Sequence, residues 1–223
     1  MTPVPAIRLA GLGVVLVAAA CGGSSGGGTG PCSPGAATQL VKQTGDAQGG
    51  YFNNPLPAAL SVKALDANNC AVPGVVINWA VASGGGGVSP AQSTTNASGV
   101  ASAIDSIGGS TPQSVTATPA ITSLATLTFS ETAAAPPTSA AVDVKDNFFS
   151  PQSAVIKTGG TVTWTWGGAA AHNVTYSGGP TPRPADGPNQ TTGMFSSTIT
   201  VVGTYDYHCT NHAGMSGTIT VLH

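Results

Sequence analysis

The chain has 223 residues, enough for two domains of about 100 residues each, and a formal net charge of −2. Only 6% of its residues are charged, which argues against nucleic-acid binding, because phosphate recognition needs clustered lysine and arginine. Apolar residues make up 41%, so the chain is not a disordered polyelectrolyte either. Many β-branched residues with frequent glycine and proline predict an all-β protein of short strands and turns.

Residues 1–20 have the features of an export signal. After Arg8, an apolar run extends to Ala20 and is too short for a comfortable membrane span. The run ends at Cys21, and the segment resembles a bacterial lipoprotein signal, in which this cysteine becomes the lipidated first residue. The Gly/Ser-rich tether 21–31 favours a lipoprotein over an ordinary secretory signal with an incidental cysteine. We therefore expect an exported protein, periplasmic or on the cell surface, held to a bacterial membrane by its lipid.

Two further cysteines, Cys32 and Cys70, are expected to form a disulfide. Export places them in an oxidising compartment, where free exposed thiols are a liability. The bridge would tie the entry of the first domain to a turn that ends at Cys70. The alternative is a pair of free buried thiols.

A first domain is predicted over residues 32–132. Its expected strands are short and evenly spaced, with polar turns between them, which predicts an antiparallel β-sandwich. Trp79 is expected in its core. The expected strands cover residues 60–65, 75–81, 100–107, 114–118 and 124–129.

This domain resembles the bacterial immunoglobulin-like domains of the invasin and intimin type. The resemblance rests on residues 62–68, 72–75, Trp79 and 95–101. It implies a spacer or adhesive module without an active site, and we find no cluster of ionisable residues here that could perform chemistry.

A proline-containing linker, 133–138, is expected to separate this domain from a second one at 139–223, also a small sandwich or Greek-key barrel. In residues 161–166 threonine alternates with Val162, Trp164 and Trp166, so these three apolar side chains share one face of a strand. The other expected strands cover residues 141–145, 154–157, 195–202, 205–209 and 217–222.

The chemistry-bearing residues lie near the end of the second domain. Cys209, His212 and Met215 are spaced three apart after a predicted strand, so a short loop can turn all three donors toward one ion. A thiolate, an imidazole and a thioether are soft to borderline ligands, which suit copper. His172 is the candidate for the fourth donor. Two histidines, one cysteine and a weak axial methionine make up blue-copper electron-transfer sites.

The second domain resembles the cupredoxins, with plastocyanin and amicyanin as the nearest subgroup. The resemblance covers residues 140–222 and is carried by segments 161–164, 172–174, 203–205 and 209–217. It implies one copper ion bound by His172, Cys209, His212 and Met215, cycling between Cu(I) and Cu(II), with transient redox partner proteins. By the same resemblance, Asn173 would hydrogen-bond near the Cys209 loop.

Other candidates fit less well. Strand alternation turns His208 away from the face of Cys209, and His223 has no partner spacing. Met194 is a weak competitor for the axial position because it lies outside the ligand loop. Zinc would gain little from a thioether.

No catalytic residues are predicted, because neither a Ser/His/Asp set nor paired carboxylates occur. We expect a type 1 copper protein acting as a one-electron carrier, with the immunoglobulin-like domain as a spacer. The alternatives are a lipoprotein that stores or delivers copper, and a surface adhesin in which the copper fold has become passive.

Overall fold

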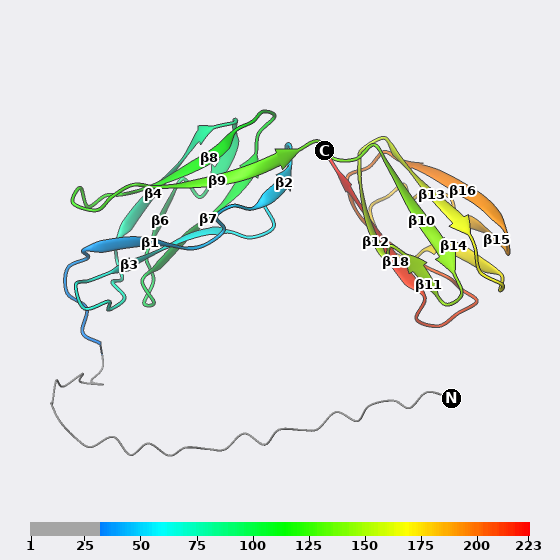
Figure 1. Cartoon of the computed structure of the whole chain (residues 1–223), viewed down its shortest axis with the longest axis horizontal. Coiled ribbons are helices and arrows are strands. Elements are labelled where there is room, and N and C mark those ends of the chain that lie inside the picture. Colours follow the sequence, from blue (N-terminus) through cyan, green and yellow to red (C-terminus); the bar gives the residue numbers. More distant parts are fainter. Residues whose placement is uncertain (1–31) are drawn as a thin grey trace, which may run out of the picture. The chain divides into compact units, whose positions relative to one another are not determined.

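The structure, a computed structural model, describes residues 32–223. The expected export signal and the lipidation site at Cys21 lie outside the described residues. The described part is all-β and contains two sandwiches, each with its own buried apolar core (Figure 1). Among these residues no helix is long and apolar enough to cross a membrane.

The first sandwich has two sheets, with strand orders β1-β3-β7-β5 and β2-β9-β8-β4-β6. Side chains alternate between buried and exposed along β7 and β8, as expected for strands with one face on a core. Its strands are β1 (Gln39–Thr44), β2 (Gly49–Tyr51), β3 (Leu60–Leu65), β4 (Val76–Ser83), β5 (Gly86–Ser89), β6 (Gln92–Thr94), β7 (Val100–Ile107), β8 (Gln113–Pro119) and β9 (Leu127–Ala134).

The core and the entry of this sandwich follow the expectations from sequence. Trp79 is buried and packs against Phe129, with ring centroids 5.9 Å apart. A disulfide joins Cys32 to Cys70 across 5.7 Å between their Cα atoms. The Asp66 carboxylate accepts hydrogen bonds from the N–H groups of Cys70 and Gly35, both at 2.8 Å. The disulfide and these hydrogen bonds therefore hold the same turn.

The linker is shorter than expected. Strand β9 continues through Ala133 and Ala134, because it pairs with β2, a strand that the sequence pattern did not indicate. Two of the six expected linker residues therefore belong to the first sandwich. The carbonyl of Pro137 already accepts the N–H of Lys157 in the second sandwich.

The second sandwich also has two sheets, with strand orders β11-β10-β13-β16 and β12-β18-β17-β14-β15 (Figure 1). Two of its strand pairs, β10 with β13 and β12 with β18, are parallel, and the others are antiparallel. Its strands are β10 (Ser139–Lys145), β11 (Phe148–Ser150), β12 (Ser153–Lys157), β13 (Gly160–Trp166), β14 (His172–Tyr176), β15 (Gly187–Gln190), β16 (Gly193–Ile199), β17 (Gly203–His208) and β18 (Ser216–Leu222).

Strand β13 shows the predicted alternation: Val162, Trp164 and Trp166 are buried. Trp164 lies at the centre of an aromatic core, edge-on to Tyr207 with ring centroids 5.5 Å apart. Such pairs add stability beyond their buried area and restrict how the two sheets can shift.

Strand β16 differs from the prediction, which placed it at residues 195–202. It begins at Gly193 and ends at Ile199, where its pairing with β13 ends opposite Gly160. Val201 and Val202 have β-favouring side chains, but no strand lies opposite them, so they form the turn into β17.

Candidate metal centre

Four strand ends meet at one edge of the second sandwich. Strands β10 and β13 run parallel, with Val144 opposite Trp166, so both end there. Strand β14 begins at this edge with His172, and its antiparallel neighbour β17 ends there at His208. The register sets Thr175 opposite His208, and this places Cys209 beside the start of β14. Residues 37 positions apart are thereby brought into contact.

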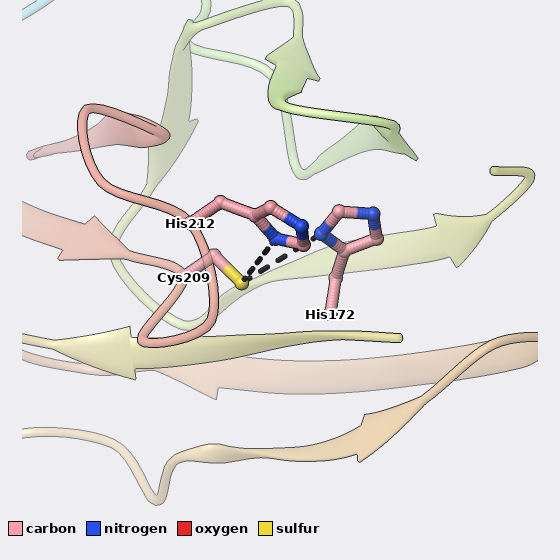
Figure 2. A group of neighbouring side chains, drawn as sticks. All are labelled: His172, Cys209 and His212. Atoms are coloured by element: carbon pink, nitrogen blue, oxygen red, sulfur yellow. Dashed lines mark hydrogen bonds between the residues drawn. The ribbon is translucent and has the colours of Figure 1, made fainter. Parts of the chain in front are cut away.

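Three of the predicted ligands converge on one point (Figure 2). The Sγ atom of Cys209 lies 3.7 Å from Nδ1 of His172 and 3.7 Å from Nδ1 of His212. The donor atoms of the three residues all lie within 4.8 Å of one another. Cys209 and His172 are buried, whereas His212 is half-buried and reaches the surface. The same nitrogen of each imidazole therefore faces the thiol.

These distances match those expected around a first-row metal ion. Bonds of about 2.3 Å to sulfur and about 2.0 Å to nitrogen, separated by about 120°, give about 3.7 Å between the two donors. The observed separations fit this value without movement of either chain segment. The donor set itself, two imidazoles with a thiolate, suits copper.

Met215 completes the ligand loop. The N–H of Cys209 donates to the carbonyl of Met215 at 2.9 Å, and the N–H of Met215 donates to the carbonyl of His212 at 3.3 Å. Met215 is 1% exposed and lines the same shallow depression as the other two loop residues. Met194, the weaker candidate, is 70% exposed on β16.

Asn173 contacts the ligand loop directly. Its amide donates to Oγ1 of Thr210 at 2.6 Å and accepts the N–H of Thr210 at 2.9 Å. This reciprocal pair clamps the start of β14 to the residue after Cys209. Because Asn173 follows His172 and Thr210 follows Cys209, these two hydrogen bonds keep His172 and Cys209 close together.

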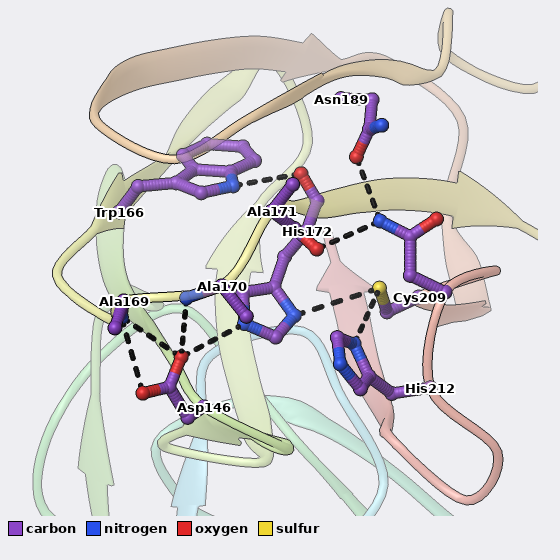
Figure 3. A network of polar contacts seen from close by, with 10 residues as sticks. Asp146, Trp166, Ala169, Ala170, Ala171, His172, Asn189, Cys209 and His212 are labelled. Atoms are coloured by element: carbon purple, nitrogen blue, oxygen red, sulfur yellow. Dashed lines mark hydrogen bonds and ion pairs between the residues drawn. The ribbon is translucent and has the colours of Figure 1, made fainter.

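Two residues that sequence reasoning did not select hold His172 in place (Figure 3). The indole N–H of Trp166 donates to the carbonyl of His172 at 2.8 Å. The Asp146 carboxylate lies 3.3 Å from Nε2 of the same ring. The sequence pattern marks Trp166 only as part of an apolar strand face, and no local pattern marks Asp146, which lies 26 positions before His172.

The Asp146 carboxylate is strongly favoured in its ionised form. The N–H groups of Ala170 and Ala169, followed by the imidazole of His172, lower the pKa of Asp146 to about 2. A negative charge is thus present behind the buried histidine at neutral pH.

Asn211, two residues after Cys209, makes a second contact between the ligand loop and the chain around His172. The Asn211 amide donates to the carbonyl of Ala171 at 2.7 Å and to the side-chain oxygen of Asn189 at 2.8 Å. It joins the ligand loop to the residue that precedes His172.

The other histidines of the described chain lie outside this cluster. His208 is half-buried, and its neighbours in β17, Tyr205 and Tyr207, point to the buried face, as the alternation predicted. His223 is exposed at the last position. Cys209 is the free cysteine among residues 32–223.

Comparisons with known proteins agree with this site. The family described as copper binding proteins, plastocyanin/azurin family, matches residues 138–222. Amicyanin-alpha of Methylorubrum extorquens is 38% identical over 92 residues, which span 39% of this chain and 75% of that protein. Plastocyanin of Scenedesmus fuscus is 36% identical over 83 residues, spanning 33% of this chain and 85% of that protein. A solved structure of an amicyanin variant in its reduced Cu(I) form is 35% identical, with a TM-score of 0.34, and the match covers 37% of this chain and 81% of that one.

The fold and the site define a copper protein built on a two-sheet sandwich. Through residues 138–222 the chain belongs to the plastocyanin/azurin family of copper-binding proteins. This domain is a cupredoxin, a carrier of electrons that binds one copper ion and is not an enzyme.

Proposed function

We propose that the chain is an exported type 1 (blue) copper protein that shuttles single electrons, with four ligands: His172, Cys209, His212 and Met215. The observation that carries this assignment is the pair of 3.7 Å separations from the Cys209 sulfur to the two histidine nitrogens. Copper bound there supplies a one-electron couple between Cu(I) and Cu(II).

The chain's own contribution is to keep the donors in place before and after the electron moves. Cys209 would provide copper with a soft anionic donor, and Met215 with a weak thioether donor. The backbone of the loop is closed by the hydrogen bonds between these two residues and His212. Because strands and hydrogen bonds define the donor positions, little rearrangement accompanies a change in oxidation state.

Electrons are expected to enter and leave at His212. His172 is fully buried, whereas His212 is half-buried and is followed by the exposed, uncharged Ala213 and Gly214. A small, uncharged surface of this kind suits a brief encounter with a redox partner protein, because weak electron-transfer complexes bury little area.

The remaining parts of the chain are proposed to place this domain outside the cytosol. The segments are a signal at 1–20 with lipidation of Cys21, a tether at 21–31, an immunoglobulin-like spacer at 32–132, a linker at 133–138 and the copper domain at 139–223. The disulfide in the first sandwich supports export, because such bonds persist in oxidising compartments. Mass spectrometry of the mature N-terminus, compared with Cys21→Ala, tests the lipid anchor; an unmodified Cys21 in the native host would refute it.

The electron-carrier assignment is tested by adding Cu(II) to the purified chain and recording its visible spectrum. We expect an intense thiolate-to-copper absorption that disappears in Cys209→Ser and changes in His212→Ala. His208→Ala is the matched control, since it removes a neighbouring imidazole outside the cluster and should leave the colour intact.

Two results would contradict the proposal: a colourless copper complex of the unchanged chain, or equal loss of colour in His208→Ala. Repeated reduction and reoxidation then separates the possible roles. A blue site that releases its copper before it exchanges an electron would indicate copper delivery.

A further inference from the structure

Both ring nitrogens of His172 have a polar neighbour (Figure 3). One nitrogen, Nδ1, faces the Cys209 sulfur at 3.7 Å, while the other, Nε2, lies 3.3 Å from Oδ1 of Asp146. The histidine side chain is fully buried, whereas the aspartate is 47% exposed. An imidazole carries its proton on one nitrogen when neutral, so a carboxylate at Nε2 favours the tautomer that leaves Nδ1 free to bind metal.

Asp146 is itself held firmly. It follows directly after β10, and its Oδ1 accepts the N–H groups of Ala169 at 2.9 Å and Ala170 at 3.0 Å. Oδ2 accepts a second bond from Ala169 at 3.1 Å. Position 168 must be glycine for this contact, because a Cβ on Gly168 would collide with the carboxylate. The loop before His172 is therefore wrapped around this one side chain.

We propose that Asp146 is the positioning residue of the copper site: it selects the metal-binding tautomer of His172 and places a negative charge behind that ligand, which favours Cu(II) over Cu(I). This inference rests on the proposed ligand role of His172. The charge reaches copper through the ring, since hydrogen bonding to a carboxylate raises the basicity of a metal-bound imidazole.

The competing explanation is that Asp146 only shapes the loop at residues 168–170. The arrangement of its bonds allows the two roles to be separated. All three donors, the N–H groups of Ala169 and Ala170 and the ring of His172, reach Oδ1. Asp146→Asn retains an oxygen at that place and loses the charge, whereas Asp146→Ala loses both the oxygen and the charge.

The test compares these two variants with Asp143→Asn, which removes an exposed carboxylate three residues earlier on β10. Two quantities are measured on the full chain: the reduction potential of the copper-loaded protein, and the tautomer of His172 in the copper-free protein by two-bond ¹H–¹⁵N NMR. Circular dichroism establishes that each variant is folded.

In Asp146→Asn we expect Cu(II) affinity to fall about tenfold relative to Cu(I), near the lower end for loss of a partner that orients a metal ligand. For one electron, a tenfold change corresponds to a rise in potential of about 59 mV. The tautomer should be retained. In Asp146→Ala the Nδ1–H form of His172 should appear in the copper-free protein. Asp143→Asn should leave the tautomer unchanged and shift the potential much less.

The proposal is overturned if Asp146→Asn moves the potential no more than Asp143→Asn does, or if Asp146→Ala leaves the tautomer unchanged. Failure of the underlying function looks different: the unchanged chain would then form no blue copper complex. The NMR measurement requires no copper, so it reports on Asp146 in either case.

Discussion

Replacing Glu131 by glutamine should make the first sandwich more stable at neutral and alkaline pH. Glu131 lies on β9 and is 6% exposed, with its side chain in the core between the two sheets. Neither of its carboxylate oxygens has a hydrogen-bond partner among the described residues, and the same holds for the buried Asp105 on β7. An unpartnered carboxylate loses its hydration without compensation, and this disfavours the charged form.

The pKa of Glu131 reflects this environment. Burial, followed by the negative charges of Asp105 and Asp46, raises it from 4.5 to about 7, and the ammonium group of Lys42 opposes part of that rise. Burial also raises the pKa of Asp105. The difference between 4.5 and about 7 corresponds to roughly 3 kcal/mol, at about 1.4 kcal/mol for each pH unit.

The sign follows from linkage. Since the pKa is higher in the folded state, stability is present in full below about pH 4.5 and is lost as pH rises toward about 7. Glutamine has a similar shape and does not titrate. The free energy of unfolding of Glu131→Gln minus that of the unchanged chain should therefore be small at pH 4 and about 3 kcal/mol at pH 8.

Amide hydrogen exchange of β7 and β9 in the full chain reports this quantity for the first sandwich alone. Glu131→Gln and the unchanged chain are compared at the same pH, because the two proteins share every other titrating group. A difference that stays constant between pH 4 and pH 8 would refute the reasoning, as would a variant that is less stable at pH 8.

Three further changes have defined outcomes. Met215→Leu should keep the blue colour, because the thiolate remains, and raise the reduction potential by removing a donor to Cu(II), whereas Met194→Leu should leave both the colour and the potential unchanged. Trp166→Phe leaves the buried His172 carbonyl without its donor and should lower the free energy of unfolding by about 1–3 kcal/mol in urea denaturation; an unchanged midpoint and slope would contradict this. Cys70→Ser opens a disulfide that spans 38 positions and should cost about 4 kcal/mol, measured by hydrogen exchange of β3; full protection of β3 in this variant would argue against it.

Local patterns predicted the strands best where one face of a strand lies on a core. Residues 60–65 and 100–107 were predicted with the bounds that the structure has, and the alternation in β13 identified its buried face. Short edge strands such as β2 and β6 were missed, because three residues carry too little periodicity. Their extent depends on the strand that lies opposite.

The ligand loop was visible in the sequence because its three members are close together in the chain. A strand followed by a short turn already brings the donors of Cys209, His212 and Met215 into one neighbourhood, and their softness indicates the metal. The same alternation along β17 excluded His208.

Only the tertiary structure shows what holds the distant ligand. The fold, through the parallel pairing of β10 with β13 and the antiparallel pairing of β14 with β17, brings Asp146, Trp166 and Cys209 around His172. Contacts across 26 and 37 positions leave no mark in local composition or period. The chain thus encodes the chemistry of its copper site locally, whereas the environment of its buried histidine arises from how the two sheets pack together.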